Sequence, residues 1–215
     1  ALQFKDLYPA DSLEAFKTFS LAEDYSRYGV LRWYASSFKV TTKDLAGHDL
    51  LSYDPAGDSL FYFVRFASDD KGQSYYELKR RLPRPSTPLN ISWEEVLAAV
   101  EKISQVKLDP GFLGLQDPIL YRTQLANGDS LVLKGRPSFT RLLRVSIGVI
   151  NQSAFKRFTG QLWFDELRAT DVAKDVGLAS RLLGNGRWAN IMDYNVAWNG
   201  RDADFLSVGE TRGSG

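Results

Sequence analysis

Short segments rich in aromatic and β-branched residues recur along the first 170 residues of the chain, each bounded by Gly, Pro, Asn or Asp. Such segments are predicted to be β-strands. They cover residues 31–40, 59–68, 74–82, 119–125, 130–135, 140–150 and 160–169. In the segment 143–150, apolar residues alternate with Arg144 and Ser146. This period of two predicts a half-buried antiparallel strand.

One segment has helical periodicity instead. Ser92 and Glu95 match a capping box, and apolar side chains follow at helical spacing up to Ile103. A helix is therefore predicted over 92–106, with weaker helical turns starting at Asp11 or near Asp24. Because strands and helices do not alternate, a parallel sheet is not expected. The pattern predicts an all-β fold, an antiparallel β-sandwich of jelly-roll type with one or two short helices.

The composition changes near Asp171, beyond which Gly and Asn become frequent. We expect a β-sandwich module over 1–171 and a Gly/Asn-rich C-terminal extension over 172–215. In the extension, Asn185–Gly186 is a turn signal and predicts a hairpin, with "YNVAW" as one strand. The last ten residues are predicted to be mobile.

The net charge and the cysteine content bear on which classes of function the chain can have. The chain has 215 residues, 27 Lys and Arg against 26 Asp and Glu, and no cysteine. A net charge of +1 provides no overall field to attract nucleic acid. The lack of cysteine excludes disulfides, thiolate metal sites and a cysteine nucleophile. No segment has the 18 or more apolar residues of a membrane helix, and the first residues lack the pattern of a signal peptide.

Two neighbouring acids, Asp165 and Glu166, lie in the apolar stretch "GQLWFDELRATDV". The strand is expected in the interior of a sheet, and the acids are expected to have partners, because burying an unpaired carboxylate is costly. Either Glu166 pairs with Arg168 or with backbone N–H groups, or the acids hold a structural calcium ion. Neighbouring strand residues point to opposite faces, so the two acids cannot form a glycosidase dyad. Replacing either with alanine is expected to cost roughly 1 to 3 kcal/mol of stability.

Each of the other candidate residues has a structural explanation as well as a functional one. Asp69 and Asp70 fit a tight turn, with calcium binding as the alternative. His48, the only histidine, lies in an expected loop, and one such residue does not build a catalytic triad. The cluster "KRR" at 79–81 is predicted to be a solvated strand edge. Aromatic residues could stack on sugar rings, although about half of them must belong to the core. The main candidates are Trp33, Tyr34, Tyr75 and Tyr76, and the others are Tyr62, Trp188 and Trp198.

Several of these segments together resemble known families. "RYGVLRWYASS", "FVRFASDDKGQSYYELKRRL" and "RLLRVSIGVINQSAFKRFTGQLWFDELRATD" are similar to strands of galactose-binding-like jelly rolls, over roughly residues 14 to 171. A narrower resemblance lies in "SDDKGQSYYEL", "IGVINQ" and "GQLWFDELRATD". These resemble modules of the type IX secretion outer-membrane translocon, the SprA/Sov family, in which a W-F-(D/N)-E-L-R phrase closes each module.

The resemblance implies a non-catalytic soluble module of a large cell-surface or outer-membrane protein of type IX secretion and gliding motility. Its partners would be proteins of the outer-membrane secretion complex, and its location the bacterial cell envelope. Jelly rolls of this class also permit a structural calcium near the acid pair, and no other cofactor is expected. The alternative is a carbohydrate-binding module attached to a secreted glycosidase, which would present aligned aromatic residues on one sheet face.

Overall fold

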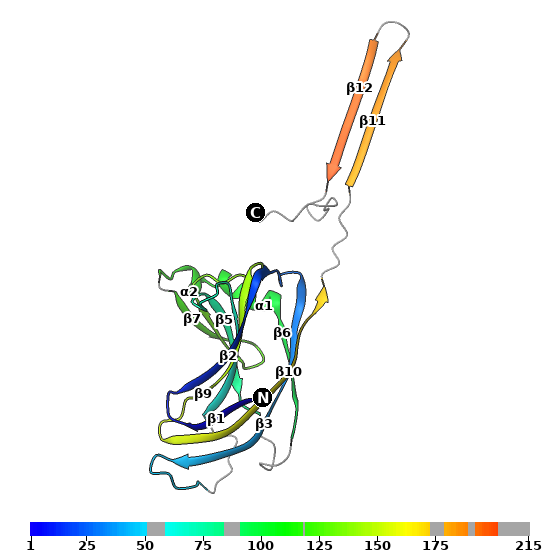
Figure 1. Ribbon diagram of the computed structural model, residues 1–215. Coiled ribbons are helices and arrows are strands. Elements are labelled where there is room, and N and C mark those ends of the chain that lie inside the picture. Colours follow the sequence, from blue (N-terminus) through cyan, green and yellow to red (C-terminus); the bar gives the residue numbers. More distant parts are fainter. Residues whose placement is uncertain (51–58, 84–90, 118, 173–178, 189–191, 202–215) are drawn as a thin grey trace. The chain divides into compact units, whose positions relative to one another are not determined.

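The computed structural model describes residues 1–50, 59–83, 91–117, 119–172, 179–188 and 192–201 (Figure 1). The chain divides into two compact units, Ala1–Val172 and Ala173–Gly215. The first unit is an all-β sandwich of two antiparallel sheets with two short α-helices, as predicted. The second unit contains a two-stranded hairpin.

One sheet of the sandwich has four strands in the order β1-β10-β3-β6. They are β1 (Leu2–Leu7), β10 (Lys156–Val172), β3 (Tyr28–Asp44) and β6 (Glu94–Ala99). The long strands β3 and β10 pair from Tyr28↔Val172 to Asp44↔Lys156, with register shifts on the way. These two strands therefore form the centre of the four-stranded sheet.

The other sheet has six strands in the order β2-β9-β4-β5-β8-β7. They are β2 (Ser12–Glu23), β9 (Leu142–Asn151), β4 (Leu60–Ala67), β5 (Tyr75–Arg81), β8 (Ser130–Lys134) and β7 (Leu120–Gln124). The turns at 68–73 and 126–130 join the β4–β5 and β7–β8 hairpins, as their sequences predict. All the predicted strands are present, whereas β1, β2 and β6 were not predicted, and β2 replaces the helical turn expected at Asp11.

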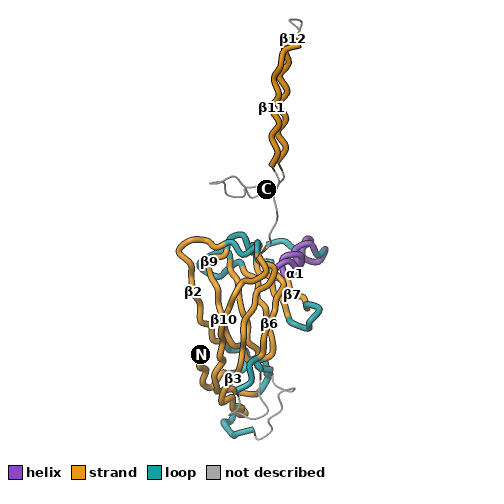
Figure 2. Tube along the Cα trace, turned by 90° about the vertical axis from the view of Figure 1, so that its right-hand side faces the viewer, coloured by secondary structure: helices purple, strands orange, loops and turns teal. Residues whose placement is uncertain are grey.

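The helix predicted over 92–106 forms only in its second half. Residues Glu94–Ala99 are strand β6, and the helices are α1 (Val100–Gln105) and α2 (Pro110–Leu113), joined by the 3-10 turn η1 (Val106–Leu108). Ser92 is not a cap, because the N-cap of α1 is Ala99. Pairing with β3 gives the β6 backbone its hydrogen bonds and buries Val96 and Ala98, so the sheet overrides the helical spacing. Figure 2 shows α1 at one end of the sandwich, and it contacts β3 and β6.

The core fills the space between the two sheets. Trp33 of the four-stranded sheet and Tyr62 of the six-stranded sheet are both fully buried, and the Trp33 indole N–H donates to the Tyr62 hydroxyl at 3.4 Å. Tyr76 stacks on Phe139 with ring centroids 4.6 Å apart. Large aromatic side chains from both sheets thus supply much of the buried apolar surface.

Strand β9 is buried more completely than its alternation predicts. Ser146, on the face expected to be polar and solvated, is only 2% exposed. On the same face, the ring of Phe63 from β4 lies against Gly148, where a Cβ atom would come within 2.2 Å of the ring and 2.6 Å of the Leu13 carbonyl oxygen. Glycine at 148 therefore makes room for a buried aromatic ring on the outer face of the sheet.

The second unit is an antiparallel hairpin of β11 (Ala179–Trp188) and β12 (Met192–Arg201). Asn185 pairs with Asn195, and Gly186 pairs with Tyr194. The predicted hairpin and its "YNVAW" strand are present, but the turn predicted at Asn185–Gly186 is wrong, because β11 continues through both residues. The tail predicted to be mobile lies outside the described residues.

Replacing Gly148 with alanine is expected to destabilise the sandwich by roughly 1 to 3 kcal/mol, because Phe63 and the β2 backbone cannot both withdraw. Chemical denaturation measures the free energy of unfolding. Gly114→Ala is the matched control: its Cβ would meet only the Pro110 carbonyl oxygen, at 3.6 Å, and its φ is −78°. Equal stability of the Gly148→Ala variant and the wild type would contradict this packing.

Candidate functional site

The acid pair at Asp165 and Glu166 lies at a bulge in β10. Register with β3 shifts between Asp165↔Tyr34 and Arg168↔Arg32, and Glu166 has φ 54°. Both acids are exposed. Glu166 accepts from Arg168 at 2.8 Å, which confirms the expected ion pair, and Asp165 accepts from the Glu166 backbone N–H at 2.9 Å.

The expectation that this strand lies inside the sheet holds for only part of its length. Strand β1 pairs with β10 from Phe158 to Leu162, and among the described residues no strand flanks β10 on that side beyond Leu162. The acids therefore lie in a stretch with one neighbouring strand. The bulge and this open side expose both carboxylates, so they do not carry the desolvation cost expected for a buried pair.

The calcium candidates do not gather into one site. The Asp69 carboxylate accepts backbone hydrogen bonds from Gln73 and Ser74 at 2.6 to 3.1 Å, as expected of a turn residue. Asp70 lies in the same turn, next to Asp69. Within the described ranges, no group of three or more His, Asp or Glu side chains could hold a metal ion. In the part of the chain that the structure describes, neither acid cluster therefore brings a third acidic side chain to a metal ion.

Several aromatic residues proposed to stack on sugars are core residues. Trp33, Tyr62 and Tyr76 are at most 1% exposed, so the stacking prediction is wrong for them. Tyr34 and Tyr75 are half-buried, and each has an arginine against its ring: Arg32 at 5.2 Å and Arg65 at 4.8 Å, respectively. Trp198 is exposed on the hairpin, and the Trp188 side chain lies outside the described residues.

His48 closes a loop. Its backbone N–H and its Nδ1 lie 2.8 and 2.9 Å from the two carboxylate oxygens of Asp44. The hydrogen bond from the imidazole, followed by that from the His48 backbone, lowers the pKa of Asp44. The His48 side chain is 80% exposed, so this pair caps the loop after β3 and does not line a cleft.

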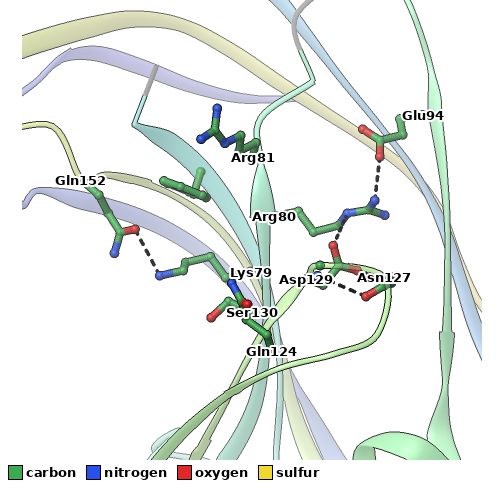
Figure 3. Close-up of a pocket in the computed structure, with 11 residues that line it drawn as sticks. Lys79, Arg80, Arg81, Glu94, Gln124, Asn127, Asp129, Ser130 and Gln152 are labelled. Carbon is green, nitrogen blue, oxygen red and sulfur yellow. Dashed lines mark hydrogen bonds and ion pairs between the residues drawn. The ribbon is translucent and has the colours of Figure 1, made fainter. Parts of the chain in front are cut away.

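A pocket at the end of β5 contains the cluster Lys79, Arg80 and Arg81 (Figure 3). Its volume is about 530 Å³. The prediction of a solvated strand edge is wrong here, because β5 lies between β4 and β8 in the sheet interior. The remaining lining is Phe61, Glu94, Gln124, Asn127, Gly128, Asp129, Ser130 and Gln152.

Arg80 connects three parts of the fold in this pocket. Its Nη2 lies 2.9 Å from Glu94 of the four-stranded sheet, and its Nε lies 2.8 Å from Asp129 in the β7–β8 turn. Asn127 also donates to Asp129, at 2.7 Å. Burial raises the pKa of Asp129, and Arg80 and Asn127 partly offset this effect. Arg80 therefore holds one side of the pocket in place.

The Lys79 side chain points away from that of Arg80, onto the outer face of the six-stranded sheet. Its ammonium lies 3.2 Å from the Gln152 side-chain oxygen and 5.3 Å from the centre of the Phe61 ring. Within the part of the chain that the structure describes, no carboxylate pairs with Lys79. As far as the described residues go, the pocket therefore presents an ammonium group in contact with an amide oxygen and a ring rather than in an ion pair.

The outer face of the six-stranded sheet also carries many positively charged side chains. Cross-strand partners share a face, and the register places six cations there, Arg65, Lys79, Arg81, Arg122, Lys134 and Arg144, with the acids Glu14 and Glu77. We call this surface the cationic face. The near balance of charge in the whole chain hides this local excess.

The acids of the cationic face are held by arginines. Arg65 lies 2.5 Å from Glu14 and 2.6 Å from Glu77, and Arg144 lies 2.8 Å from Glu14. Burial by itself raises the pKa of Glu14. Hydrogen bonds from Ser146 and Arg144 and the charge of Arg65 outweigh this effect, so the pKa is lowered overall.

Glu166→Ala is expected to change the free energy of unfolding by less than about 0.5 kcal/mol, because the ion pair is exposed. Glu166→Gly is expected to be more stable than Glu166→Ala by about 1 kcal/mol, since glycine adopts a positive φ without strain. Urea denaturation of both variants tests this. A loss of about 2 kcal/mol in the alanine variant would indicate a buried role for the acid.

Glu14→Gln is expected to reduce stability at pH 7 by about 2 kcal/mol, because Arg65 and Arg144 lose a charged acceptor. The folded pKa of Glu14 is lowered, so its stabilisation is present above about pH 4.5 and is lost as pH falls through the folded value. The variant should therefore lose less stability than the wild type on acidification. Asp49→Asn removes an exposed charge and is the control; equal acid sensitivity of Glu14→Gln and wild type would refute the network.

No protein-family model matches the chain, and no curated protein matches it. Among the described residues, no helix is long and apolar enough to cross a membrane. The features that bear on function are therefore the pocket, the cationic face and the exposed apolar residues themselves.

Proposed function

We propose that the chain is a non-catalytic module of a large cell-surface or outer-membrane protein of type IX secretion and gliding motility, where it acts in protein interaction or scaffolding. The phrase WFDELR at 163–168 supports the resemblance to that family, and the β11–β12 hairpin carries the interaction role. A ribbon of two strands is at best marginally stable alone in water. A hairpin that remains ordered in its protein is expected to be completed by other strands or by a partner.

The side chains of the hairpin support completion by another protein surface. Leu182 pairs with Trp198, and Gly184 pairs with Val196, so these residues share one face of the ribbon. Leu182, Val196 and Trp198 are each more than 50% exposed. Exposed apolar residues grouped on one face are typical of interaction sites.

The sandwich carries a second surface suited to protein contact. On the four-stranded sheet, the centroid of the Trp163 ring lies 5.2 Å from that of Phe38 and 6.3 Å from that of Trp93. Trp93 and Leu97 are 45% and 56% exposed, and they lie just before and within the edge strand β6. Aromatic clusters are enriched at protein interfaces, and an unpaired strand edge is a common docking element.

The charged residues favour a binding role over catalysis. Glu14 and Glu77 are each paired with an arginine, and His48 is engaged by Asp44. Groups held in such ion pairs stabilise a fold and fix a surface. The carbohydrate-binding alternative, based on aligned aromatic residues, loses support because Trp33 and Tyr76 are buried.

Photo-crosslinking in cells that make the full protein tests the proposal. A benzophenone amino acid placed at Leu182 or Val196 is expected to give adducts with envelope proteins, because these side chains face a partner. The control is Leu108, which is 72% exposed on η1. Hairpin positions that crosslink no more than Leu108 would overturn the proposed interaction.

The full-length gene provides a second test. If the module belongs to the SprA/Sov family, its coding sequence should contain further W-F-(D/N)-E-L-R phrases in a very long chain. A neighbouring glycosidase domain would instead favour the carbohydrate-binding alternative.

A further inference from the structure

The pocket of Figure 3 and the cationic face form one continuous surface. Phe61, Lys79 and Arg81 line the pocket, and by register they also belong to the outer face of the six-stranded sheet. Ser130 and Gln124 extend the same row, because Lys79 pairs with Ser130 and Ser130 pairs with Gln124. A ligand in the pocket would therefore have a route along the cationic face.

The pocket has a charge that selects anions. Besides its cations, the lining carries two carboxylates, Glu94 and Asp129. Both carboxylates pair with Arg80, and within the described ranges the partners of the Lys79 ammonium are an amide oxygen and an aromatic ring. An anion that displaces the weak Gln152 contact gains a charge-assisted hydrogen bond from Lys79.

The rest of the lining fits a sugar. The side-chain amides of Gln124 and Gln152 and the hydroxyl of Ser130 both donate and accept hydrogen bonds, as sugar hydroxyls do. The Phe61 ring beside Lys79 offers an apolar contact for the C–H groups of a sugar ring. The volume of about 530 Å³ lies within the range of small-molecule sites.

We infer that this surface binds an acidic polysaccharide, with the carboxylate of one sugar unit on Lys79 in the pocket and further carboxylates along the cationic face. Neutral sugars would lack the contact with Lys79. This inference stands apart from the proposed scaffolding role, since it uses neither the hairpin nor the aromatic cluster around Trp163.

The aromatic residues of the cationic face argue against nucleic acid as the natural ligand. Single-stranded nucleic acid binds by stacking bases on exposed rings. Phe63 is buried, and the guanidinium of Arg144 lies 3.6 Å from the centre of the Phe16 ring. Guanidinium groups thus already occupy one face of the Phe63 ring and of the Phe16 ring, where a base would stack.

Binding of the protein to sodium polygalacturonate, measured by calorimetry and affinity electrophoresis, tests the inference. We expect binding that weakens as salt is raised, and at least tenfold weaker binding of neutral dextran, because the charged contact is lost. Lys79→Gln is expected to reduce the affinity by about tenfold. Lys102→Gln, an exposed charge change on α1, should leave it unchanged.

Phe61→Leu keeps an apolar side chain but removes the ring, and it should weaken binding while leaving the melting temperature near that of the wild type. Dextran sulfate, a sulfated polysaccharide, and oligothymidylate, a single-stranded nucleic acid, test whether the surface prefers carboxylates to sulfates or phosphates. No binding of polygalacturonate, equal losses in Lys79→Gln and Lys102→Gln, or tighter binding of oligothymidylate than of polygalacturonate would overturn the inference.

Discussion

Contact between large aromatic side chains of the two sheets is the interaction on which the sandwich depends. Trp33 and Tyr62 come from different sheets, are both fully buried, and share a hydrogen bond. Removal of its hydroxyl from water raises the pKa of Tyr62, so the group stays neutral in the folded protein. Each such ring buries roughly 150 to 250 Å², and the contact between the two rings sets the separation of the sheets at this point.

Because the interior is filled in this way, the charged residues of the strands lie on the outer faces and at the ends of the sandwich. Arg65 lies over the Phe63 ring at 4.2 Å and binds two glutamates, so the outer face of the six-stranded sheet is itself packed and ordered. Arg80 closes one end by joining β5 to both Glu94 and Asp129. Ordered cations next to an open pocket form a preformed surface, which lowers the entropic cost of binding an anion.

Strand patterns were predictable because they are local. Turn residues mark the hairpins at 68–73 and 126–130. The hydrophobic segments beside these turns have the short length of strands, so their sequence alone predicts strands. The segment 92–106 was not predictable in the same way. Val96 fits both a helix and a strand, and pairing with β3 decided between them. The bulge at Glu166 was also hidden, because no glycine marks its positive φ.

The sequence by itself determined the all-β class and most of the strands, and it gave the ion pair of Glu166 with Arg168 as one of several alternatives, since these features depend on residues close together in the chain. The tertiary structure decided which strands are neighbours, and therefore which side chains share a surface. It moved Trp33 and Tyr76 from candidate ligand contacts into the core. It also brought Lys79, from an apparent surface cluster, together with Gln152, more than seventy residues away, because strand order depends on burial over the whole chain and not on local pattern.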